Sequence, residues 1–293
     1  MVIIAASAYG SLSILTTLGA RIGVGLLPLM AWRYALAAPV LAAIAGPREL
    51  AAVPWQRALA LFVIGGGGQS LVTYFSLSAL AWMPAASLGF LFYTYPAWVA
   101  IFAAVAGVER LTPTRIAALA MALFGITLMV GAPWDLALPW PGVWRALLSA
   151  VIYAAYIPLL HRLRGPLSPA AAAAYLIAGA ATIFLVAAHR DAGALAPMFA
   201  ATVVPLAWTY AAILAVYSTV ISFLTFLRGL EVLGAVRAAI LSTTEPLFTA
   251  VLALVVLRQP LGLPTLLGGA CIVAAILVLE RATPPTDELP HAA

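Results

Sequence analysis

Residues 239–250 read AILSTTEPLFTA and place a carboxyl and a proline inside a long apolar run. Glu245 is the one acidic residue that neither a loop nor a helix end accounts for. A carboxyl near the centre of a membrane helix costs about 2.5–3.5 kcal/mol, so such a residue usually serves a function. Pro246 has no backbone N–H and frees the carbonyl of Ser242. A membrane helix tolerates such a break only where it lines a cavity or packs on protein, so we expect a cavity here.

The composition indicates a membrane protein throughout. Hydrophobic residues make up 65% of the 293 residues and charged residues only 8%, unlike a soluble globular domain. At about 20 residues per span, this length allows roughly ten helices. We therefore predict an all-α membrane protein with one membrane domain over residues 1–280 and a polar cytoplasmic tail over 281–293. Hydropathy places the helices near 2–19, 27–45, 58–80, 85–107, 113–131, 142–161, 169–188, 204–227, 235–257 and 262–280.

The chain contains an internal repeat. An offset of 150 lays residues 74–130 over 224–280 and places Pro96 on Pro246. Repeat one spans about residues 2–131 and repeat two about 142–280, with five predicted helices in each. Because five is odd, the second repeat enters the membrane from the opposite side. Such inverted repeats around a central cavity are typical of transporters, whose substrate sites lie near the midplane between the repeats.

The arginines predict the orientation. All 14 basic residues are Arg, and they are scattered over short loops, so the lipid bilayer rather than nucleic acid is the expected partner. Nine arginines fall on one side and four on the other, which predicts that both termini are cytoplasmic in a bacterial-type inner membrane. The nine are Arg48, Arg57, Arg110, Arg115, Arg162, Arg164, Arg228, Arg237 and Arg281, and the four are Arg21, Arg145, Arg190 and Arg258.

Several motifs together resemble a known family. They are Trp32-Arg33-Tyr34, the segment from Tyr74 through Pro84-Ala85 to Tyr95-Pro96, the Glu109-Arg110-Leu111-Thr112 turn, Glu245-Pro246, and the Arg258-Gln259-Pro260-Leu261 turn. In order and spacing they resemble the drug/metabolite transporter superfamily, in its ten-helix branch with two EamA domains. Gln259 stands where that turn usually carries an acid. The aromatic content and the length look most like the YddG-type exporters of aromatic amino acids. The resemblance implies a secondary transporter that works by alternating access on a small-molecule substrate.

Helical spacing suggests which residues meet that substrate. Ser242, Glu245 and Thr249 share one helix face, and the matching row in repeat one is Phe92, Tyr95 and Trp98. Aromatic side chains would stack on an apolar side chain, while Glu245 and the freed carbonyls would meet an ammonium group. The predicted substrate-binding residues are Glu245, Ser242, Tyr95, Trp98, Tyr74, Tyr153, Tyr156, Tyr217 and Ser11.

Other functions fit less well. A multidrug or amphipathic-cation exporter would use a deep carboxyl and aromatic walls equally well, and a non-transporting receptor or scaffold is a minor alternative. Arg33 lies near the start of its helix, so we expect it to snorkel to the outer surface. With no basic residue then reaching the cavity, transport of sugar phosphates or nucleotide sugars is less favoured.

The sequence favours no enzymatic or metal chemistry. It lacks paired intramembrane carboxylates, an H-E-x-x-H motif and a Ser, His and acid set at plausible depth, so no enzyme, metal or cofactor is predicted. The run Gly65–Gly68 has no lysine after it, unlike a phosphate-binding loop, and favours close helix packing. The oligomeric state and the coupling ion stay open.

Overall fold

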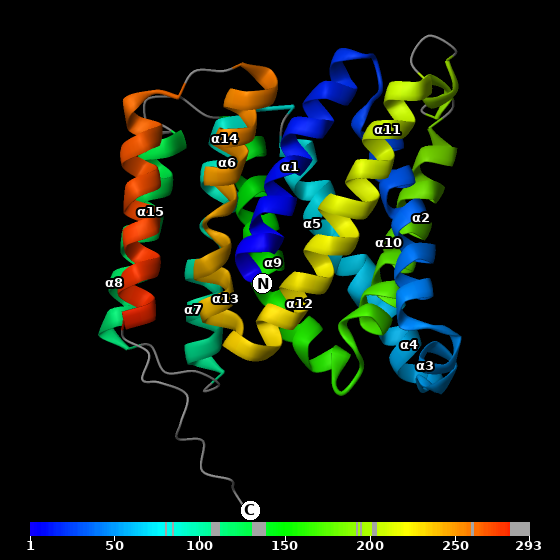
Figure 1. Cartoon of the computed structure of the whole chain (residues 1–293), viewed down its shortest axis with the longest axis horizontal. Helices are drawn as coiled ribbons and strands as arrows, with labels where there is room; N and C mark the ends of the chain where they lie inside the picture. Colours follow the sequence, from blue (N-terminus) through cyan, green and yellow to red (C-terminus); the bar gives the residue numbers. More distant parts are fainter. Residues whose placement is uncertain are drawn as a thin grey trace, which may run out of the picture.

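The protein is a bundle of helices that run roughly side by side (Figure 1). The computed structural model describes residues 1–79, 81–83, 85–106, 112–130, 139–191, 193, 195–200, 204–258 and 261–281. Within these ranges, seven helices are long and apolar enough to cross a membrane. Three shorter apolar helices, Tyr95–Val105, Pro113–Met129 and Leu263–Leu279, accompany them. The prediction of an all-α membrane protein with about ten spans is therefore confirmed.

The first repeat contains five spans, two of which are interrupted. The third span contains a π-helical segment and the fourth breaks into two helices. Their elements are α1 (Val2–Arg21), α2 (Leu26–Ala45), the short α3 (Pro47–Ala52), then α4 (Trp55–Ala60), η1 (Leu61–Gly65) and α5 (Gly66–Ala79) as the third span, α6 (Ala85–Phe92) and α7 (Tyr95–Val105) as the fourth, and α8 (Pro113–Val130).

The second repeat has the same plan. Its eighth span again contains a π-helical segment, and its ninth again breaks into two helices. The elements are α9 (Trp140–Arg164), α10 (Pro169–Arg190), the short η3 (Ala196–Phe199), then α11 (Val204–Ala215), η4 (Val216–Ile221) and α12 (Ser222–Leu233) as the eighth span, α13 (Ala235–Ser242) and α14 (Glu245–Leu257) as the ninth, and α15 (Leu263–Arg281).

The two helix breaks fall at equivalent positions. Residues 93–94 separate α6 from α7, and residues 243–244 separate α13 from α14, which reproduces the offset of 150 found in the sequence. Pro96 and Pro246 are each the second residue of the helix that follows. Both breaks lie near mid-height of the bundle (Figure 1). In the same view α1 runs upward and α9 runs downward, so the two repeats are inverted.

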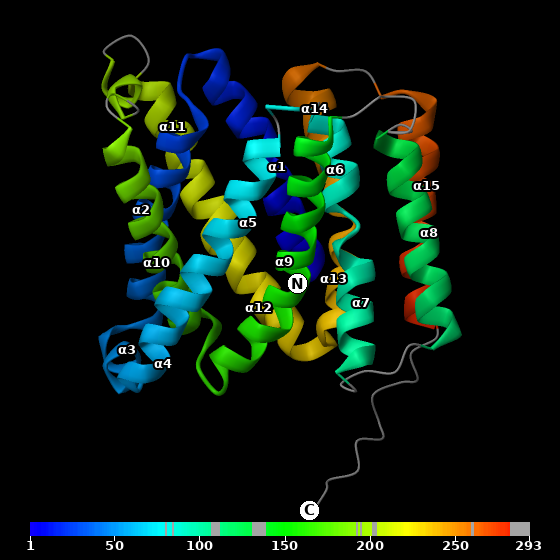
Figure 2. The ribbon, with the colours of Figure 1, turned by 180° about the vertical axis from the view of Figure 1, so that it is seen from behind.

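The repeats interlock rather than lie apart. In the contacts between helices, α2 packs on α10, α1 packs on α12 and α14, and α8 packs on α15. Figure 2 shows the α8–α15 pair at one edge of the bundle and the α2–α10 pair at the other. A Cβ atom on Gly66 would lie 2.6 Å from the Cα atom of Gly179, so glycine allows α5 and α10 to approach closely. The Gly65–Gly68 run therefore serves close packing, although Gly67 itself has open space beside it.

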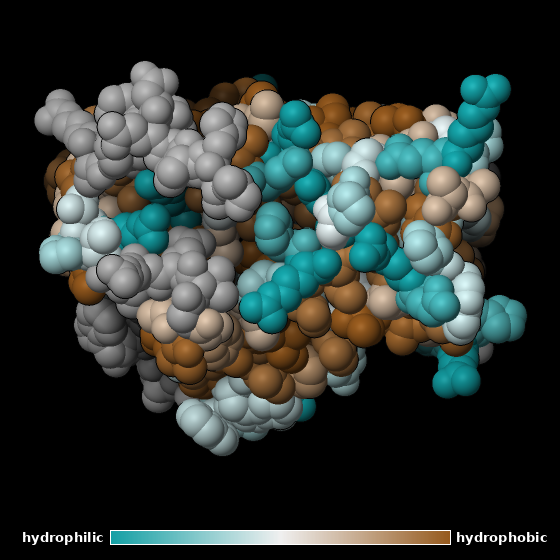
Figure 3. All heavy atoms as spheres, turned by 90° about the horizontal axis from the view of Figure 1, so that it is seen from below, coloured by the Kyte–Doolittle hydropathy of each residue, from teal (hydrophilic) through white to brown (hydrophobic). Residues whose placement is uncertain are grey.

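One end of the bundle carries many hydrophilic side chains. It is the lower end in Figure 1, where α15 finishes, and Figure 3 shows it face-on. The connections α2–α3, α9–α10 and α12–α13 lie at this end (Figure 1). The turn at residues 109–112 and the tail at 282–293 contain residues outside the described ranges, as does the turn at 258–261.

Reporter fusions test the orientation that the arginines predict. A fusion after Arg164, at the end of α9, should report the cytoplasm, and a fusion after Arg190, at the end of α10, should report the periplasm. The positive-inside rule sets this expectation. Paired alkaline phosphatase and fluorescent protein fusions measure it. The opposite pattern at both positions would reverse the predicted orientation.

Candidate functional site

A cavity of about 700 Å³ lies among the central helices. Its volume is within the range of roughly 300–1,000 Å³ that is common for small-molecule sites. Seven aromatic residues contribute to its wall: Tyr9, Phe92, Tyr93, Tyr153, Tyr156, Phe223 and Phe226. The polar and charged residues of the lining are Ser13, Thr16, Thr17, Arg33, Gln69, Thr73, Ser76, Glu245, Thr249 and Thr265.

Glu245 lies at the break of the ninth span. It is the first residue of α14, where the helix dipole favours a negative charge. The hydroxyls of Thr243 and Thr244 donate to the carbonyls of Ile240 and Leu241, at 2.6 and 2.8 Å. These two hydroxyls are therefore occupied by the backbone of α13. The carboxyl is the polar side chain of this break that lines the cavity, and it interacts with the side chain of Tyr93.

Gly10 allows the start of α14, which carries Glu245, to pack closely on α1. A Cβ atom on Gly10 would lie 3.0 Å from the carbonyl oxygen of Glu245 and 3.0 Å from the hydroxyl of Thr249. The Thr249 hydroxyl donates to the carbonyl of Gly10 at 3.1 Å. A side chain at position 10 would therefore push the start of α14 away from α1.

The break of the fourth span supplies an aromatic wall instead of a charge. Tyr95 occupies the place that Glu245 has in the other repeat, but its side chain is buried behind the lining. The ring centroids of Tyr95 and Tyr153 are 4.8 Å apart, and those of Phe92 and Tyr153 are 5.5 Å apart. Phe92 and Tyr153 line the cavity together with Tyr93.

Arg33 is buried at the cavity rather than exposed at the outer surface. Only 2% of the residue is exposed, and it belongs to the cavity lining. Its Nε donates to the hydroxyl of Thr219 at 2.6 Å, and its Nη2 donates to the carbonyl of Ser218 at 3.0 Å. The expectation that Arg33 snorkels is therefore wrong, and so is the inference that no basic residue reaches the cavity.

The π-helical segment η4 explains why Arg33 is buried rather than exposed at the outer surface. In η4 the Thr219 hydroxyl donates to the carbonyl of Leu214, five residues back, at 2.9 Å. The Ser218 carbonyl of this segment accepts from the guanidinium of Arg33 and also from the hydroxyl of Ser222, at 2.7 Å. The equivalent segment η1 offers the carbonyl of Gly65 to the hydroxyl of Tyr156 at 3.0 Å. An assignment of helices from ordinary periodicity does not show these segments, although the polar pair Ser218-Thr219 is a signal of one.

The cavity lining contains three of the nine predicted substrate-binding residues: Glu245, Tyr153 and Tyr156. Three others are buried outside it. Ser242 donates to the carbonyl of Ala238 at 2.8 Å, and the hydroxyls of Ser11 and Ser218 are 2.7 Å apart. Tyr95 lies behind Tyr153, as described above.

The remaining three of the nine also lie outside the described lining. Trp98 packs near Phe102, with 6.4 Å between the ring centroids. The Tyr217 hydroxyl lies 3.2 Å from that of Ser7, and its side chain is partly exposed. Tyr74 is 62% exposed, because the cavity face of α5 is the one that carries Gln69, Val72, Thr73 and Ser76.

The helix-face argument missed several lining residues besides Arg33. Tyr9 and Gln69 are the most polar of them after Arg33. Gln69 donates from Nε2 to the hydroxyl of Tyr34 at 3.1 Å, which orients its amide. Gln69 follows directly on the Gly65–Gly68 run, and an amide beside such a run is the signal that could have identified it. Among the residues described, no group of three or more His, Cys, Asp and Glu side chains could hold a metal.

The described lining of the cavity reaches one end of the bundle. It includes Leu26, at the start of α2, and Leu261, just before α15. Both helices begin at the end opposite the one where α15 finishes (Figure 1). Toward the other end the described lining stops at Leu160 and Phe226.

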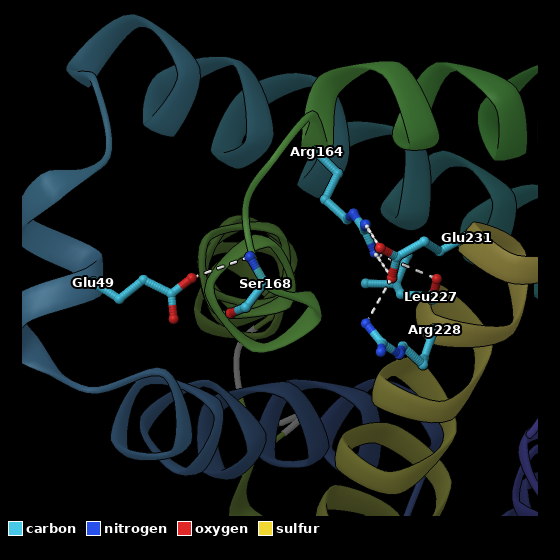
Figure 4. Close-up of polar contacts among 6 residues, drawn as sticks. All are labelled: Glu49, Arg164, Ser168, Leu227, Arg228 and Glu231. Carbon is cyan, nitrogen blue, oxygen red and sulfur yellow. Dashed lines mark hydrogen bonds and ion pairs between the residues drawn. The ribbon is translucent and has the colours of Figure 1, made fainter. Parts of the chain in front are cut away.

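We call that other end the closed end. Polar contacts connect its helices. Arg164 at the end of α9 pairs with Glu231 of α12 at 3.2 Å, and Arg228 pairs with the same carboxylate at 3.1 Å (Figure 4). Glu49 of α3 accepts a hydrogen bond from the backbone N–H of Ser168 at 3.0 Å, which links repeat one to repeat two. The Tyr175 hydroxyl adds a second link by donating to the Leu50 carbonyl at 3.0 Å.

Comparisons with known proteins agree with this architecture. Inverted repeats around a central cavity are found in many membrane transporters. Residues 1–131 and 140–281 each match the EamA-like transporter family, and the chain belongs to that family. A relative from Bacillus subtilis (strain 168), "Uncharacterized transporter YcbK", is 30% identical over 196 residues. That match covers 65% of this chain and 62% of the relative.

A solved structure, described only as "Crystal structure of protein", has the same fold. Its TM-score is 0.77 at 22% identity, and the match covers 95% of this chain and 94% of the other. The chain is therefore a multi-pass membrane protein of the EamA-like transporter family.

Cysteine labelling tests where the cavity opens. In a Cys271→Ala background, Ser13→Cys should react with a membrane-impermeant maleimide added from the periplasmic side, because Ser13 lines the cavity. Ser11→Cys is the matched control on the same helix and should stay unlabelled, because Ser11 is only 7% exposed. Equal labelling at both positions, or labelling of Ser13→Cys only from the cytoplasmic side, would contradict the described opening.

Proposed function

We propose that this protein is a secondary transporter that exports aromatic and other apolar amino acids by alternating access. The observation that carries the proposal is the central cavity, which combines an aromatic wall with a carboxyl at a helix break. We also propose that it resides in the inner membrane with both termini in the cytoplasm, as the arginine distribution predicts.

The aromatic wall would hold the substrate side chain. Phe92, Tyr93 and Tyr153 form a group whose neighbouring ring centroids lie 5.5–5.9 Å apart. These distances show that the rings already pack as aromatic pairs, which favour tilted or edge-to-face contacts. An aromatic substrate ring would add one more such contact from the cavity side. Glu245, which touches this group through Tyr93, would then meet the substrate ammonium.

In alternating access, the end that is now open would close and the closed end would open. If the topology is as predicted, the described state is open toward the periplasm. The Glu49–Ser168 contact joins the two repeats at the closed end. Residues of both repeats line the cavity, so a motion of groups of helices around it would carry the site from one side to the other.

A multidrug or amphipathic-cation exporter is the alternative function, because Glu245 and the aromatic wall suit an organic cation as well. A sugar phosphate fits less well even with Arg33 in the lining, since Glu245 would repel a phosphate dianion in the same cavity.

Substitution of Tyr153 tests the aromatic wall. Tyr153→Ala should reduce transport of tryptophan and phenylalanine about 2–10-fold more than that of threonine, because aromatic pairs contribute about 0.5–1.5 kcal/mol. Trp98→Ala is the control, because Trp98 packs outside the described lining. It should lower folded yield but leave selectivity unchanged. Fluxes of the three amino acids in proteoliposomes measure both effects. A larger loss of selectivity in Trp98→Ala than in Tyr153→Ala would reject the proposed wall.

Substitution of Glu245 tests the carboxyl. Glu245→Gln keeps the shape but removes the charge that would bind an ammonium group. Transport should fall at least about tenfold, since hydrogen bonds to charged groups contribute about 1.5–3 kcal/mol. Flux should also become less sensitive to pH, because an amide cannot change its protonation state. Asp191→Asn, the same chemical change at an exposed position, should have no effect. Wild-type flux and pH profile in Glu245→Gln would remove Glu245 from the mechanism.

A further inference from the structure

We propose that Arg33 binds the carboxylate of the substrate, so that the cavity has a cationic and an anionic pole and selects zwitterionic amino acids over amines. The proposal deepens the proposed function and rests on it, because it assigns the substrate class of the same cavity. It also separates amino acid export from the alternative of cation export.

The hydrogen bonds of Arg33 leave donors available. A guanidinium carries five N–H groups. The structure accounts for three of them, with the Thr219 hydroxyl, the Ser218 carbonyl and the Met30 sulfur as acceptors. The thioether of Met30, at 3.6 Å, is a weak acceptor. Two N–H groups, one on each Nη atom, therefore have no acceptor in the described structure, and we assign them to the paired hydrogen bonds that arginine forms with a carboxylate.

Arg33 forms no ion pair within 4.0 Å in the described structure, and the carboxyl of Glu245 acts on its charge only from a longer distance. In the described part of the chain, the ion pairs within 4.0 Å are those that Glu231 forms with Arg164 and Arg228. An arginine stays protonated in proteins, and burying its charge without an anion is unfavourable. A residue that only donated hydrogen bonds to η4 would not need to be charged. A guanidinium that is 2% exposed and lines a cavity instead points to an anionic ligand.

The two charged residues of the cavity act as separate poles. Glu245 and Arg33 both line it, yet they form no ion pair within 4.0 Å in the described structure. Tyr9 of α1 also lines the cavity and lies within electrostatic range of both groups. A ligand seated beside Tyr9 could therefore place an ammonium toward Glu245 and a carboxylate toward Arg33. An α-amino acid carries both groups on one carbon, whereas an amine or a quaternary cation leaves the Arg33 pole unsatisfied.

Three indole compounds test this assignment. Tryptophan carries both charges, tryptamine lacks the carboxylate, and indole-3-propionate lacks the ammonium. We expect the wild-type protein in proteoliposomes to be inhibited by tryptophan at concentrations at least about tenfold lower than by either analogue. In Arg33→Gln this preference over tryptamine should fall to within about threefold, while the preference over indole-3-propionate should remain or increase.

Matched variants separate recognition from folding. Arg33→Lys keeps the charge and should retain more of the preference over tryptamine than Arg33→Gln does. Thr219→Val removes the acceptor of Nε but keeps the guanidinium, and it should retain the preference. Arg21→Gln, at the exposed end of α1, controls for loss of a positive charge near the cavity mouth. Gel filtration and thermal unfolding in detergent confirm that each variant is folded.

The outcomes distinguish failure of this assignment from failure of the proposed function. If folded Arg33→Gln keeps the wild-type preference for tryptophan over tryptamine, Arg33 does not bind the carboxylate. Equal inhibition of the wild-type protein by tryptophan and tryptamine would overturn the assignment even where Arg33→Gln fails to fold. Wild-type protein that transports organic cations but no amino acid would overturn the proposed function itself.

Discussion

A membrane interior offers no water to a backbone group that has lost its helical partner, and this constraint organises the centre of the protein. Two spans break at mid-height and two others contain π-helical segments. Each interruption finds its hydrogen bonds inside the protein. The hydroxyls of Thr243 and Thr244 bond to α13, Arg33 bonds to η4, and Tyr156 bonds to η1. Arg33 and Tyr156 among these groups also line the cavity, whereas Thr243 and Thr244 hold the break from outside the described lining.

The inverted repeat determines how the helices are arranged. The side chains that line the cavity differ between the two repeats. Position 95 in repeat one and position 245 in repeat two follow equivalent breaks, yet one is a buried tyrosine and the other a carboxyl at the cavity. The π-helical segments likewise occur in both repeats, but one carbonyl accepts from a tyrosine and the other from an arginine. Identical halves would give a symmetric cavity. The difference between them gives an aromatic wall on one side and charged groups on others.

The sequence predicted the spans and the repeat well because both depend on apolar length and on proline, which act locally. The break at Glu245-Pro246 and its counterpart at Tyr95-Pro96 are examples. Which side chains reach the cavity depends instead on helix rotation and on contacts between distant residues. Helical spacing predicts that Tyr74 and Tyr217 line the cavity, but in the structure they are 62% and 36% exposed and lie outside the described lining. Arg33 was misplaced because its partners, Ser218 and Thr219, are 185 and 186 residues away in the chain.

The ion pairs at the closed end differ in how far water reaches them. The side chains of Glu231 and Arg228 are 37% and 55% exposed, whereas that of Arg164 is only 7% exposed. The Arg228–Glu231 pair lies within α12 and is screened by water, while the Arg164–Glu231 pair connects α9 to α12. Contacts that water reaches can break and re-form readily, as the proposed alternating access would require, whereas the bonds of Arg33 to η4 are buried. In the proposed mechanism the centre of the molecule would therefore stay intact while the closed end opens, and a substrate held at the centre would pass from one side to the other.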